Sequence, residues 1–341
     1  MNEERPKKPV RVGVIGTGHF ADEHLVPALH EISPKLFWTV LSRDRGRGEA
    51  FAHKHGATSP HPVYTDLGAF LADPNLTAVL IPTPDASHAA YAIAAAKAGK
   101  HVFVEKPMAP TSAEAAEMVS ACRAAGVLLT VGYHNRFHIV HQALKKEMNG
   151  RWGKPQHMSV HWTSALMDRQ SWNGSNQRWW SLSALGTHAL DFVRWCMMPA
   201  CGEVRSVRGL FGHPRTAVSR DENATMLLSF MSGATAEIHV SISHAPVKRI
   251  EVHLEKATIF AEDTLGAKSS GKFLVRPTHQ GAEDLPTSCT VNNPYTDELD
   301  YFLSCINFLG STEYSRSLEV TGEEGLRNVE ILEQVEADAR R

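Results

Sequence analysis

A short glycine-rich stretch near the N-terminus has the most informative spacing in this sequence of 341 residues. Gly16, Gly18 and Ala21 form the pattern Gly-x-Gly-x-x-Ala between an apolar run and a helical pattern. In this context the first glycine permits a tight turn, the second lets the backbone approach a pyrophosphate, and the small third residue lets the helix pack closely on the strand. The helix N-terminus then offers backbone N–H groups to phosphate. We therefore predict a dinucleotide site in this turn, which includes His19 and Phe20.

The end of the next apolar run bears on which dinucleotide binds. An acidic residue there would accept hydrogen bonds from the ribose hydroxyls of NAD. This chain has Ser42 and Arg43 instead, and Arg43 is suited to hold a 2′-phosphate by charge-assisted hydrogen bonds. We predict NADP as the cofactor, with NAD possible. The alternative is that Asp44 takes the ribose and Arg43 is solvated.

Alternating strands and helices must position these residues. Strand-like runs separated by helical patterns continue to about Gly132, which predicts a mostly parallel sheet with right-handed crossovers. The predicted strands are Val10–Ile15, Phe37–Leu41, Ala78–Ile81, His101–Val104 and Val127–Val131.

The pattern changes after Gly132, where neighbouring strand-like runs joined by short turns predict an antiparallel sheet. These runs are Val204–Phe211, Ala224–Phe230, Ala234–Ser243 and Arg249–Leu254. The predicted fold class is α/β. A Rossmann dinucleotide-binding domain over residues 1–133 precedes an α/β domain over residues 134–341 with a large open, mainly antiparallel sheet. The second domain is expected to bind substrate and to form oligomer contacts, and its terminal helix is able to pack back on the first domain.

Four further blocks resemble the Gfo/Idh/MocA family, the relatives of glucose–fructose oxidoreductase and inositol dehydrogenase. They are Thr83-Pro84-x-x-x-His88, Glu105-Lys106-Pro107, Asn135-Arg136-Phe137 and Gly186-x-His188-x-x-Asp191. The resemblance covers essentially the whole chain. It implies an NAD(P)-dependent oxidoreductase that interconverts a secondary alcohol and a ketone on a sugar, polyol or related cyclic substrate.

The resemblance also implies the roles of particular residues. Lys106 matches the catalytic lysine and His188 the catalytic histidine, both beside the substrate. The positions expected near the cofactor are Thr83, Pro84, His88, Glu105, Lys106 and Asn135. The chemistry is consistent with these roles, because a lysine can polarise a reacting oxygen and a histidine can transfer a proton near neutral pH. The alternatives are a surface lysine at 106 and a core or helix-capping histidine at 188.

One position departs from the family pattern. Where the family places an aspartate four residues before the histidine, this chain has Ala184. We rank first that Lys106 is the main proton donor and that His188 orients the substrate. The second-ranked alternative is that Asp191 or a residue of the tryptophan-rich segment substitutes for the aspartate. The third is that catalysis is slow or lost. Two other functions therefore stay open: a cofactor-binding sensor or scaffold, and non-redox glycoside cleavage with recycled cofactor.

The segment before His188 is rich in tryptophan. Because aromatic faces stack on sugar rings, we predict that Trp172 and Trp179 form part of the substrate site. The alternative is that two or more of the tryptophans in this part of the chain are core residues; they are Trp162, Trp172, Trp179 and Trp180.

The composition of the chain limits the classes of binding partner that we expect. A formal net charge of -2 gives no reason to expect nucleic acid or a membrane surface, and no apolar run is long enough to span a bilayer. The five cysteines are widely spread and form no Cys-x-x-Cys pair, so we expect a cytoplasmic protein without disulfides. No metal is expected, since His134 and His138 lack a further ligand at matching spacing.

We expect a homo-dimer or homo-tetramer. Apolar residues at period two in the run Ala234–Ser243 form a face that needs cover, namely Ala236, Ile238, Val240 and Ile242. The chain's own helices are the alternative cover.

Overall fold

The computed structural model describes residues 9–165, 178–212, 220–266, 271–279, 283–290, 292–309 and 318–341. The chain divides into two compact units. The first comprises Met1–Gly132 and Tyr295–Leu326, and the second Tyr133–Pro294 and Arg327–Arg341. The domain bounds inferred from the sequence stay a prediction. In the structure the segment Tyr295–Leu326 clusters with the first unit.

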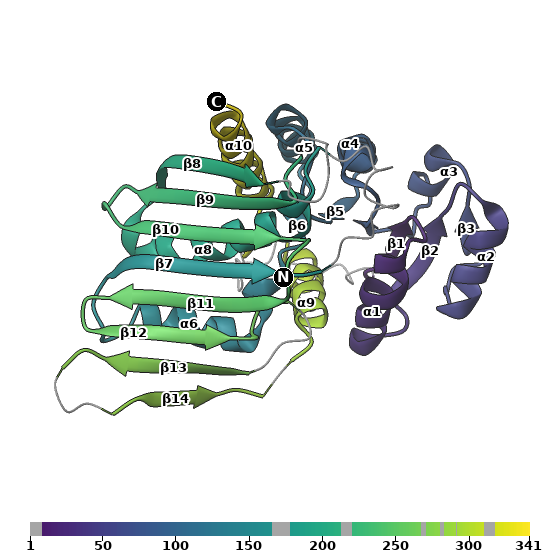
Figure 1. The fold of residues 1–341 in the computed structure, drawn as a ribbon. Coiled ribbons are helices and arrows are strands. Elements are labelled where there is room, and N and C mark those ends of the chain that lie inside the picture. The colour runs from purple at the N-terminus through teal and green to yellow at the C-terminus, as the bar shows by residue number, and fades with distance from the viewer. Residues whose placement is uncertain are drawn as a thin grey trace, which may run out of the picture. The chain divides into compact units, whose positions relative to one another are not determined.

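The first unit is built on a parallel sheet with the strand order β3-β2-β1-β4-β5-β6 (Figure 1). This is the strand order of a doubly wound Rossmann fold, so the predicted fold class is confirmed here. Its strands are β1 (Val12–Ile15), β2 (Phe37–Leu41), β3 (Val63–Tyr64), β4 (Ala78–Ile81), β5 (His101–Val104) and β6 (Leu129–Val131).

Helices connect the strands of this sheet. The first connection is a π-helical turn, η1, that continues into α1. The helical elements are η1 (Ala21–Leu25), α1 (Val26–Ile32), α2 (Arg45–Lys54), α3 (Leu67–Leu71), η2 (Asp85–Ser87), α4 (His88–Lys97) and α5 (Ser112–Ala125). Local signals set their ends. The Thr111 side chain accepts a hydrogen bond from the Glu114 N–H at the start of α5, and Gly126 ends the helix at φ 66°.

A late segment of the chain completes the first unit. Helix α9 (Pro294–Phe308) brings Phe302 to a ring-centroid distance of 5.8 Å from Phe103 in β5. The Thr130 hydroxyl of β6 donates a hydrogen bond to the Val320 carbonyl at 2.6 Å. Residues at least 190 positions apart are therefore joined in the core of this unit.

The second unit is built on a sheet with the strand order β14-β13-β12-β11-β7-β10-β9-β8. Among the strand pairs within the described residues, only β7–β10 is parallel, so the sheet is mainly antiparallel, as predicted. Its strands are β7 (Pro155–Thr163), β8 (Val204–Gly212), β9 (Asn223–Phe230), β10 (Thr235–Ser241), β11 (Val247–Leu254), β12 (Ala257–Glu262), β13 (Lys272–Pro277) and β14 (Leu285–Ser288).

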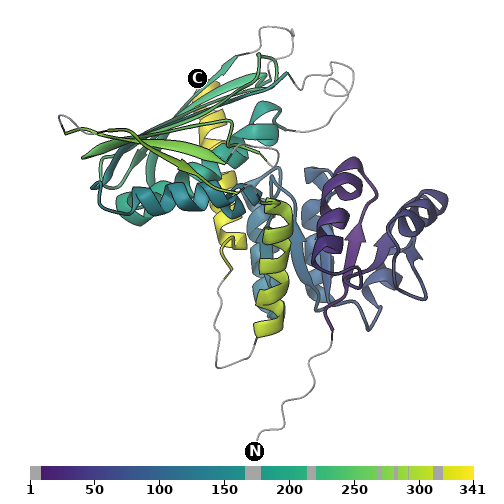
Figure 2. The same cartoon turned by 90° about the horizontal axis from the view of Figure 1, so that it is seen from below.

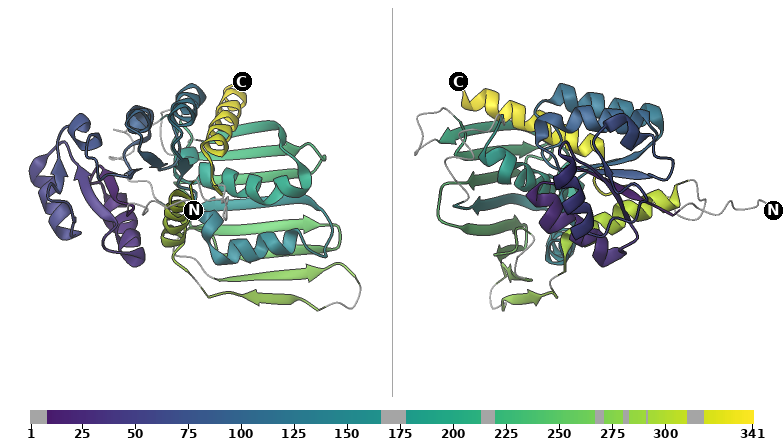
Figure 3. Two further views of the ribbon diagram at one scale, coloured as in Figure 1. Left: turned by 180° about the vertical axis from the view of Figure 1, so that it is seen from behind. Right: turned by 90° about the vertical axis from the view of Figure 1, so that its right-hand side faces the viewer.

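The described helices of this unit lie on one face of the sheet (Figure 2), where the teal helices α6 and α8 lie over the strands (Figure 3, left). The helical elements are η3 (His134–Phe137), α6 (Ile139–Met148), η4 (Leu182–Gly186), α8 (Thr187–Cys201) and, from Arg327 on, α10 (Gly322–Ala339). The apolar side chains of β10 are buried beneath these helices, and α8 is in contact with β10. The apolar residues Ala236 to Ile242 are thus covered by the chain itself, and the reason given above for self-association does not hold.

Candidate functional site

A cavity of about 490 Å³ lies at the carboxyl ends of β1, β2 and β4, where open α/β sheets bind ligands. Six predicted cofactor-site residues line it: Gly16, Gly18, Ser42, Arg43, Thr83 and Pro84. The lining also includes residues that were not predicted from the sequence, among them Thr17, Thr65, Leu67 and Tyr91. The cavity thus joins segments that lie far apart in the sequence.

The glycines of the turn shape one wall of this cavity. Gly16 has φ 103°, a backbone conformation that side chains disfavour, and a Cβ there would lie 3.1 Å from Thr83 Cγ2. A Cβ at Gly18 would meet no atom within 4 Å, so the backbone at Gly18 is open to a ligand. Ala21 is the first residue of η1, and its side chain is buried. These features fit a pyrophosphate seated against the turn and the helix N-terminus.

His19 and Phe20, also predicted for this site, do not line the cavity. His19 is exposed. The ring of Phe20 packs against Tyr295 and His24, with centroids 5.5 Å and 5.2 Å away.

The segment after β2 presents cations to the cavity. Arg43 and Arg47 are exposed residues that line it. The Asp44 carboxylate accepts a hydrogen bond from the Arg47 N–H at 2.8 Å and so caps α2. The buried Ser42 hydroxyl donates to the Asp44 carbonyl at 2.8 Å. The acidic side chain is therefore used in the helix cap, while the arginines border the cavity.

His88 is buried and is not among the residues that line the cavity. Its ring nitrogens stand 2.7 Å from the Thr83 carbonyl oxygen and 3.1 Å from the Pro107 carbonyl oxygen. Burial lowers the pKa of this imidazole. The structure thus places His88 as a link between the loops after β4 and β5.

Glu105 and Lys106 follow β5. The Lys106 N–H donates a hydrogen bond to the Glu105 carboxylate at 3.2 Å, and the Lys106–Pro107 peptide bond is cis. Burial raises the pKa of Glu105. Burial also lowers the pKa of Lys106, while Glu105 and then Asp85 oppose that shift electrostatically. A lysine with a lowered pKa exchanges a proton at smaller cost, which suits acid–base chemistry.

Asn135 and His188, the remaining predicted residues, belong to the second unit. The buried Asn135 side chain accepts a hydrogen bond from the Gly266 N–H at 3.2 Å through Oδ1. His188 is buried near the start of α8, within an aromatic group. Its ring centroid lies 4.7 Å from that of His134, 5.8 Å from that of Trp162 and 5.9 Å from that of Tyr133.

Asp191, offered above as a substitute for the absent aspartate, is engaged elsewhere. Its carboxylate accepts hydrogen bonds from Arg136 at 2.6 and 2.8 Å and from the Asn328 side chain at 2.9 Å. The Arg136–Asp191 ion pair is buried. Asp191 therefore holds η3, α8 and α10 together within the second unit.

Asp221 is a residue of this region that sequence reasoning missed. Its carboxylate accepts hydrogen bonds from the N–H groups of Trp180 and Leu182, at 2.8 and 2.7 Å, and from the Ser181 hydroxyl at 3.1 Å. These bonds hold the start of η4, which leads directly into α8 and His188. Burial raises the pKa of Asp221 to about 6.

Three of the four tryptophans in this part of the chain lie within the described residues, and all three are buried. Trp179 is 1% exposed, and its indole N–H donates to Glu336 at 3.1 Å. Trp162 and Trp180 are also buried. The structure therefore favours the core alternative for Trp179, while Trp172 lies outside the described residues.

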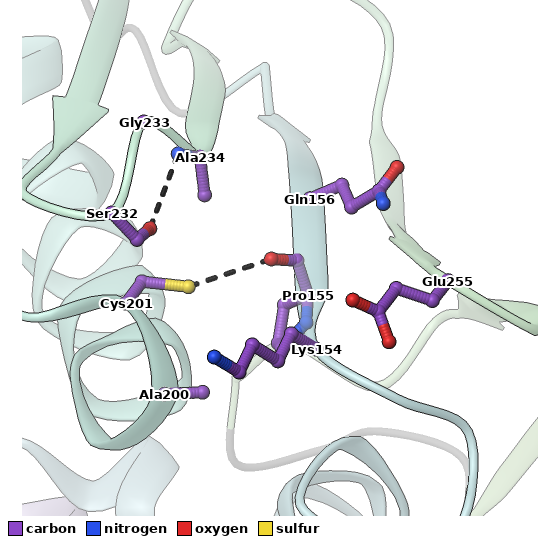
Figure 4. A pocket seen from close by; sticks show the side chains of 9 residues that line it. All are labelled: Lys154, Pro155, Gln156, Ala200, Cys201, Ser232, Gly233, Ala234 and Glu255. Atoms are coloured by element: carbon purple, nitrogen blue, oxygen red, sulfur yellow. Dashed lines mark hydrogen bonds between the residues drawn. The ribbon is translucent and has the colours of Figure 1, made fainter.

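A second cavity, of about 330 Å³, lies in the second unit away from the predicted residues (Figure 4). Lys154, Glu255 and Cys201 are among its lining, and the Cys201 thiol donates a hydrogen bond to the Pro155 carbonyl. Burial raises the pKa of this thiol, which disfavours the reactive thiolate.

Among the described residues, no group of three or more histidine, cysteine, aspartate or glutamate side chains is arranged to hold a metal ion. No helix within the described ranges is both long and apolar enough to cross a membrane.

Comparison with known proteins connects both units to one family. Residues 10–133 match the model of an oxidoreductase family with an NAD-binding Rossmann fold, GFO_IDH_MocA, and residues 140–260 match the C-terminal domain of the same family. The chain is 26% identical to 1,5-anhydro-D-fructose reductase of Ensifer adhaerens, covering 93% of this chain and 92% of the relative. It is 36% identical over 126 residues to D-xylose 1-dehydrogenase (NADP(+)) 2 of Haloferax volcanii, covering 37% of this chain and 38% of the relative.

A solved structure shares the fold over nearly the whole length. Aldose-aldose oxidoreductase from Caulobacter crescentus superposes with a TM-score of 0.85 at 24% identity, covering 97% of each chain. The two family matches together cover more than half of the sequence. With the Rossmann strand order and the glycine-lined cavity, they show that this chain belongs to the GFO/IDH/MocA family of NAD-binding oxidoreductases.

Proposed function

We propose that this oxidoreductase interconverts a secondary alcohol and a ketone on a sugar, polyol or related cyclic substrate, with NADP preferred over NAD. The observation that carries the proposal is the Glu105–Lys106 pair, which follows a strand of the sheet that bears the glycine-lined cavity. A bound nicotinamide supplies the hydride or accepts it.

The protein's own residues must then bind the reacting oxygen and exchange its proton. Lys106 is assigned to this task, because burial lowers its pKa toward the working range of an acid–base group. Glu105 stays beside it through the hydrogen bond to the Lys106 N–H. His188 is assigned to orient the substrate. This assignment fits its aromatic surroundings and the presence of Ala184 where the family pattern has an aspartate.

The proposal of NADP rests on the segment after β2. Asp44 caps α2, and Arg43 and Arg47 line the cavity, where they are suited to pair with a 2′-phosphate. A relative named as an NADP(+)-dependent enzyme supports the same preference.

The proposed substrate class follows the relatives' names, which refer to an anhydrosugar and to D-xylose. Trp172 remains proposed as a substrate contact. Because all five cysteines are free thiols, a reducing compartment such as the cytoplasm fits the chain.

We also propose that the protein is a homo-dimer or homo-tetramer. The other face of the second sheet, opposite the buried side chains of β10, carries exposed leucines. Leu227 in β9 is 49% exposed, and Leu210 in β8 is 70% exposed. Large exposed leucines on a sheet face often mark a contact with another chain.

The test is cofactor turnover by the purified full chain. NADPH or NADP⁺ is supplied with a panel of polyols, sugars and cyclic ketones, and the oxidation state of the cofactor is followed. We expect turnover with at least one member and its loss in Lys106→Ala. Cofactor binding without turnover on any member would instead favour a sensor or scaffold. Glycoside cleavage without net redox change would favour the recycled-cofactor reaction.

A further inference from the structure

Asp221 is a buried carboxylate two residues before β9, and it binds a segment 39 to 41 positions earlier in the chain. Its Oδ1 atom accepts a hydrogen bond from the Trp180 N–H at 2.8 Å. Its Oδ2 atom accepts from the Leu182 N–H at 2.7 Å and from the Ser181 hydroxyl at 3.1 Å. The Asp221 carbonyl accepts from the Ser181 N–H at 2.9 Å. One residue therefore binds three consecutive residues, with both carboxylate oxygens in use.

These three residues begin the helical stretch that carries His188. Leu182 is the first residue of η4, and η4 ends at Gly186, directly before α8. The backbone is helical at both ends of η4, with φ −66° and ψ −34° at Ser181 and φ −63° and ψ −37° at Thr187. The stretch therefore continues without a break into α8, whose second residue is His188. Because a continuous helical stretch moves as one body, the placement of its first turn helps to set the placement of His188.

The surroundings of Asp221 suit an ionised carboxylate. The first turn of a helix has N–H groups without partners inside the helix, and a negative charge there is stabilised by the helix dipole. Burial raises the pKa of Asp221 to about 6, although the N–H groups of Leu182 and Trp180 favour the charged form. Most of the carboxylate is therefore ionised at neutral pH. The charged residues beside it in the sequence are Arg220, whose guanidinium lies 5.4 Å from the Trp180 ring centroid, and the buried Glu222.

The chain lacks the carboxylate that the family pattern places four residues before the histidine. Ala184 occupies that place, and its N–H donates a hydrogen bond to the Trp180 carbonyl at 2.9 Å. Asp191, which follows His188 on α8, is held by Arg136 in a buried ion pair. The carboxylate of Asp221, in contrast, accepts its three hydrogen bonds from the start of the stretch that leads to His188.

We propose that Asp221 is the positioning residue of His188. It fixes the start of the helical stretch and through it the histidine ring, in place of the aspartate that the family pattern has at the position of Ala184. In this role Asp221 acts through the backbone and not by contact with the substrate. The inference rests on the proposed role of His188 in catalysis, whereas the positioning itself is measurable without turnover.

The first test combines Asp221→Asn and His188→Asn, alone and together, in the full chain. Asparagine keeps the shape of the carboxylate but turns N–H donors toward a segment that itself offers donors, so the bonds to residues 180–182 are weakened. We expect kcat to fall about tenfold, less than the roughly 100-fold that a misplacement of about 1 Å can cost. In the His188→Asn background the same change should have little further effect, because Asp221 acts through His188. Dinucleotide affinity should not change, since the cavity assigned to the cofactor is lined by residues of the first unit.

The second test is NMR of the full chain labelled at histidine, which measures the positioning without turnover. The His188 ring resonances, assigned by their loss in His188→Asn, should shift in Asp221→Asn. Ser181→Ala removes only one of the hydrogen bonds and should shift them in the same direction by a smaller amount. It is also the variant to use if Asp221→Asn does not fold.

The matched control is Asp338→Asn. The Asp338 carboxylate also accepts a backbone hydrogen bond within the second unit, from the Gly209 N–H at 2.9 Å, but it joins α10 to β8. This variant should lower the free energy of unfolding and leave both kcat and the His188 resonances unchanged.

His188 resonances that stay unshifted in both Asp221→Asn and Ser181→Ala would overturn the proposal. Equal losses of kcat with and without the His188 side chain would also overturn it, since Asp221 would then support the fold in general. Should the resonances shift while His188→Asn turns over substrate normally, the positioning would stand and the catalytic role of His188 would fail.

Discussion

The Glu105 carboxylate lies so close to Gly132 that a Cβ at Gly132 would stand 2.6 Å from Glu105 Oε1. Gly132 directly follows β6, and its N–H donates a hydrogen bond to the Val104 carbonyl. The absence of a side chain at this position leaves room for the buried carboxylate beside Lys106.

This contact predicts the effect of Gly132→Ala. The added methyl group must displace the Glu105 side chain, and overpacking of this kind costs about 1–3 kcal/mol. We expect a lower free energy of unfolding and, under the proposed function, a kcat about tenfold lower. Urea unfolding and steady-state kinetics measure the two effects. In a Glu105→Ala background the same substitution should cost much less. Equal costs in both backgrounds would show that the carboxylate is not what the methyl group meets.

Lys106→Ala should lower turnover by about 10²–10⁴-fold, the range for losing one proton-transfer group. Binding of the dinucleotide should change little, because the cavity is lined by other residues. His188→Asn should have the smaller effect on kcat, since His188 is assigned to orient the substrate. Steady-state kinetics on both variants decides whether Lys106 or His188 is the main proton donor. A larger loss in His188→Asn would make the histidine the proton donor.

Arg43→Ala and Arg47→Ala should each weaken NADPH binding by about 10- to 100-fold, the value of one charge-assisted hydrogen bond. NADH affinity should stay nearly constant, because it lacks the 2′-phosphate. Arg45→Ala is the matched control, since Arg45 pairs with Glu49 at 3.8 Å and does not line the cavity. Calorimetry that found equal losses for both nucleotides would contradict the preference for NADP.

His141 predicts a dependence of stability on pH. The ring is buried between the Asn135 carbonyl, at 2.9 Å, and the Thr264 hydroxyl, at 3.2 Å. Burial lowers the pKa of His141 from 6.5 to about 3. The unfolded chain therefore binds a proton that the folded chain does not, and the free energy of unfolding falls as the pH drops from about 6.5 toward 3.

The size of this effect is about 1.4 kcal/mol per pH unit within that window. His141→Gln, which keeps a polar side chain without a titrating group, should reduce the slope by that amount in urea unfolding between pH 6 and 4. His53→Gln at an exposed position is the control and should leave the slope unchanged. An unaltered slope in His141→Gln would mean that the ring is already charged in the folded protein.

Leu227→Lys should disrupt self-association if the exposed face of the second sheet forms the contact. A lysine there places a charge on the apolar surface, and light scattering should report a smaller particle. Leu309→Lys replaces a leucine of similar exposure in the first unit, 47% compared with 49%, and should not change the particle size. If light scattering found only a monomer for the unmodified protein, the proposed self-association would be wrong.

The fold of the first unit was predictable because its signals are local. Three strands match their predicted bounds: Phe37–Leu41, Ala78–Ile81 and His101–Val104. Each is an apolar run with turn residues at its ends. β3 was not predicted, since it has only two residues. The strands β12, β13 and β14 were also missed, because β12 follows β11 after only two residues and the other two alternate weakly.

The candidate site was predictable only where a motif lies within a few residues. The glycine turn and the Glu105-Lys106-Pro107 block are of this kind. Asp221 gave no such signal, since the groups it binds lie about 40 positions earlier in the chain. The contact between His134 and His188 likewise arises from packing of two separate elements, which no spacing in the sequence reveals.

The segment Tyr295–Leu326 has a consequence for biosynthesis. A ribosome that has made residues up to Gly132 has produced every strand of the first sheet, yet Phe103 still lacks Phe302 and Thr130 still lacks the Val320 carbonyl. The nascent nucleotide-binding unit must therefore wait, incompletely packed, while the whole second sheet is translated. A fragment ending at Gly132 would expose this apolar surface permanently, so excision of the unit for expression on its own should yield an aggregating product unless residues 295–326 are supplied with it.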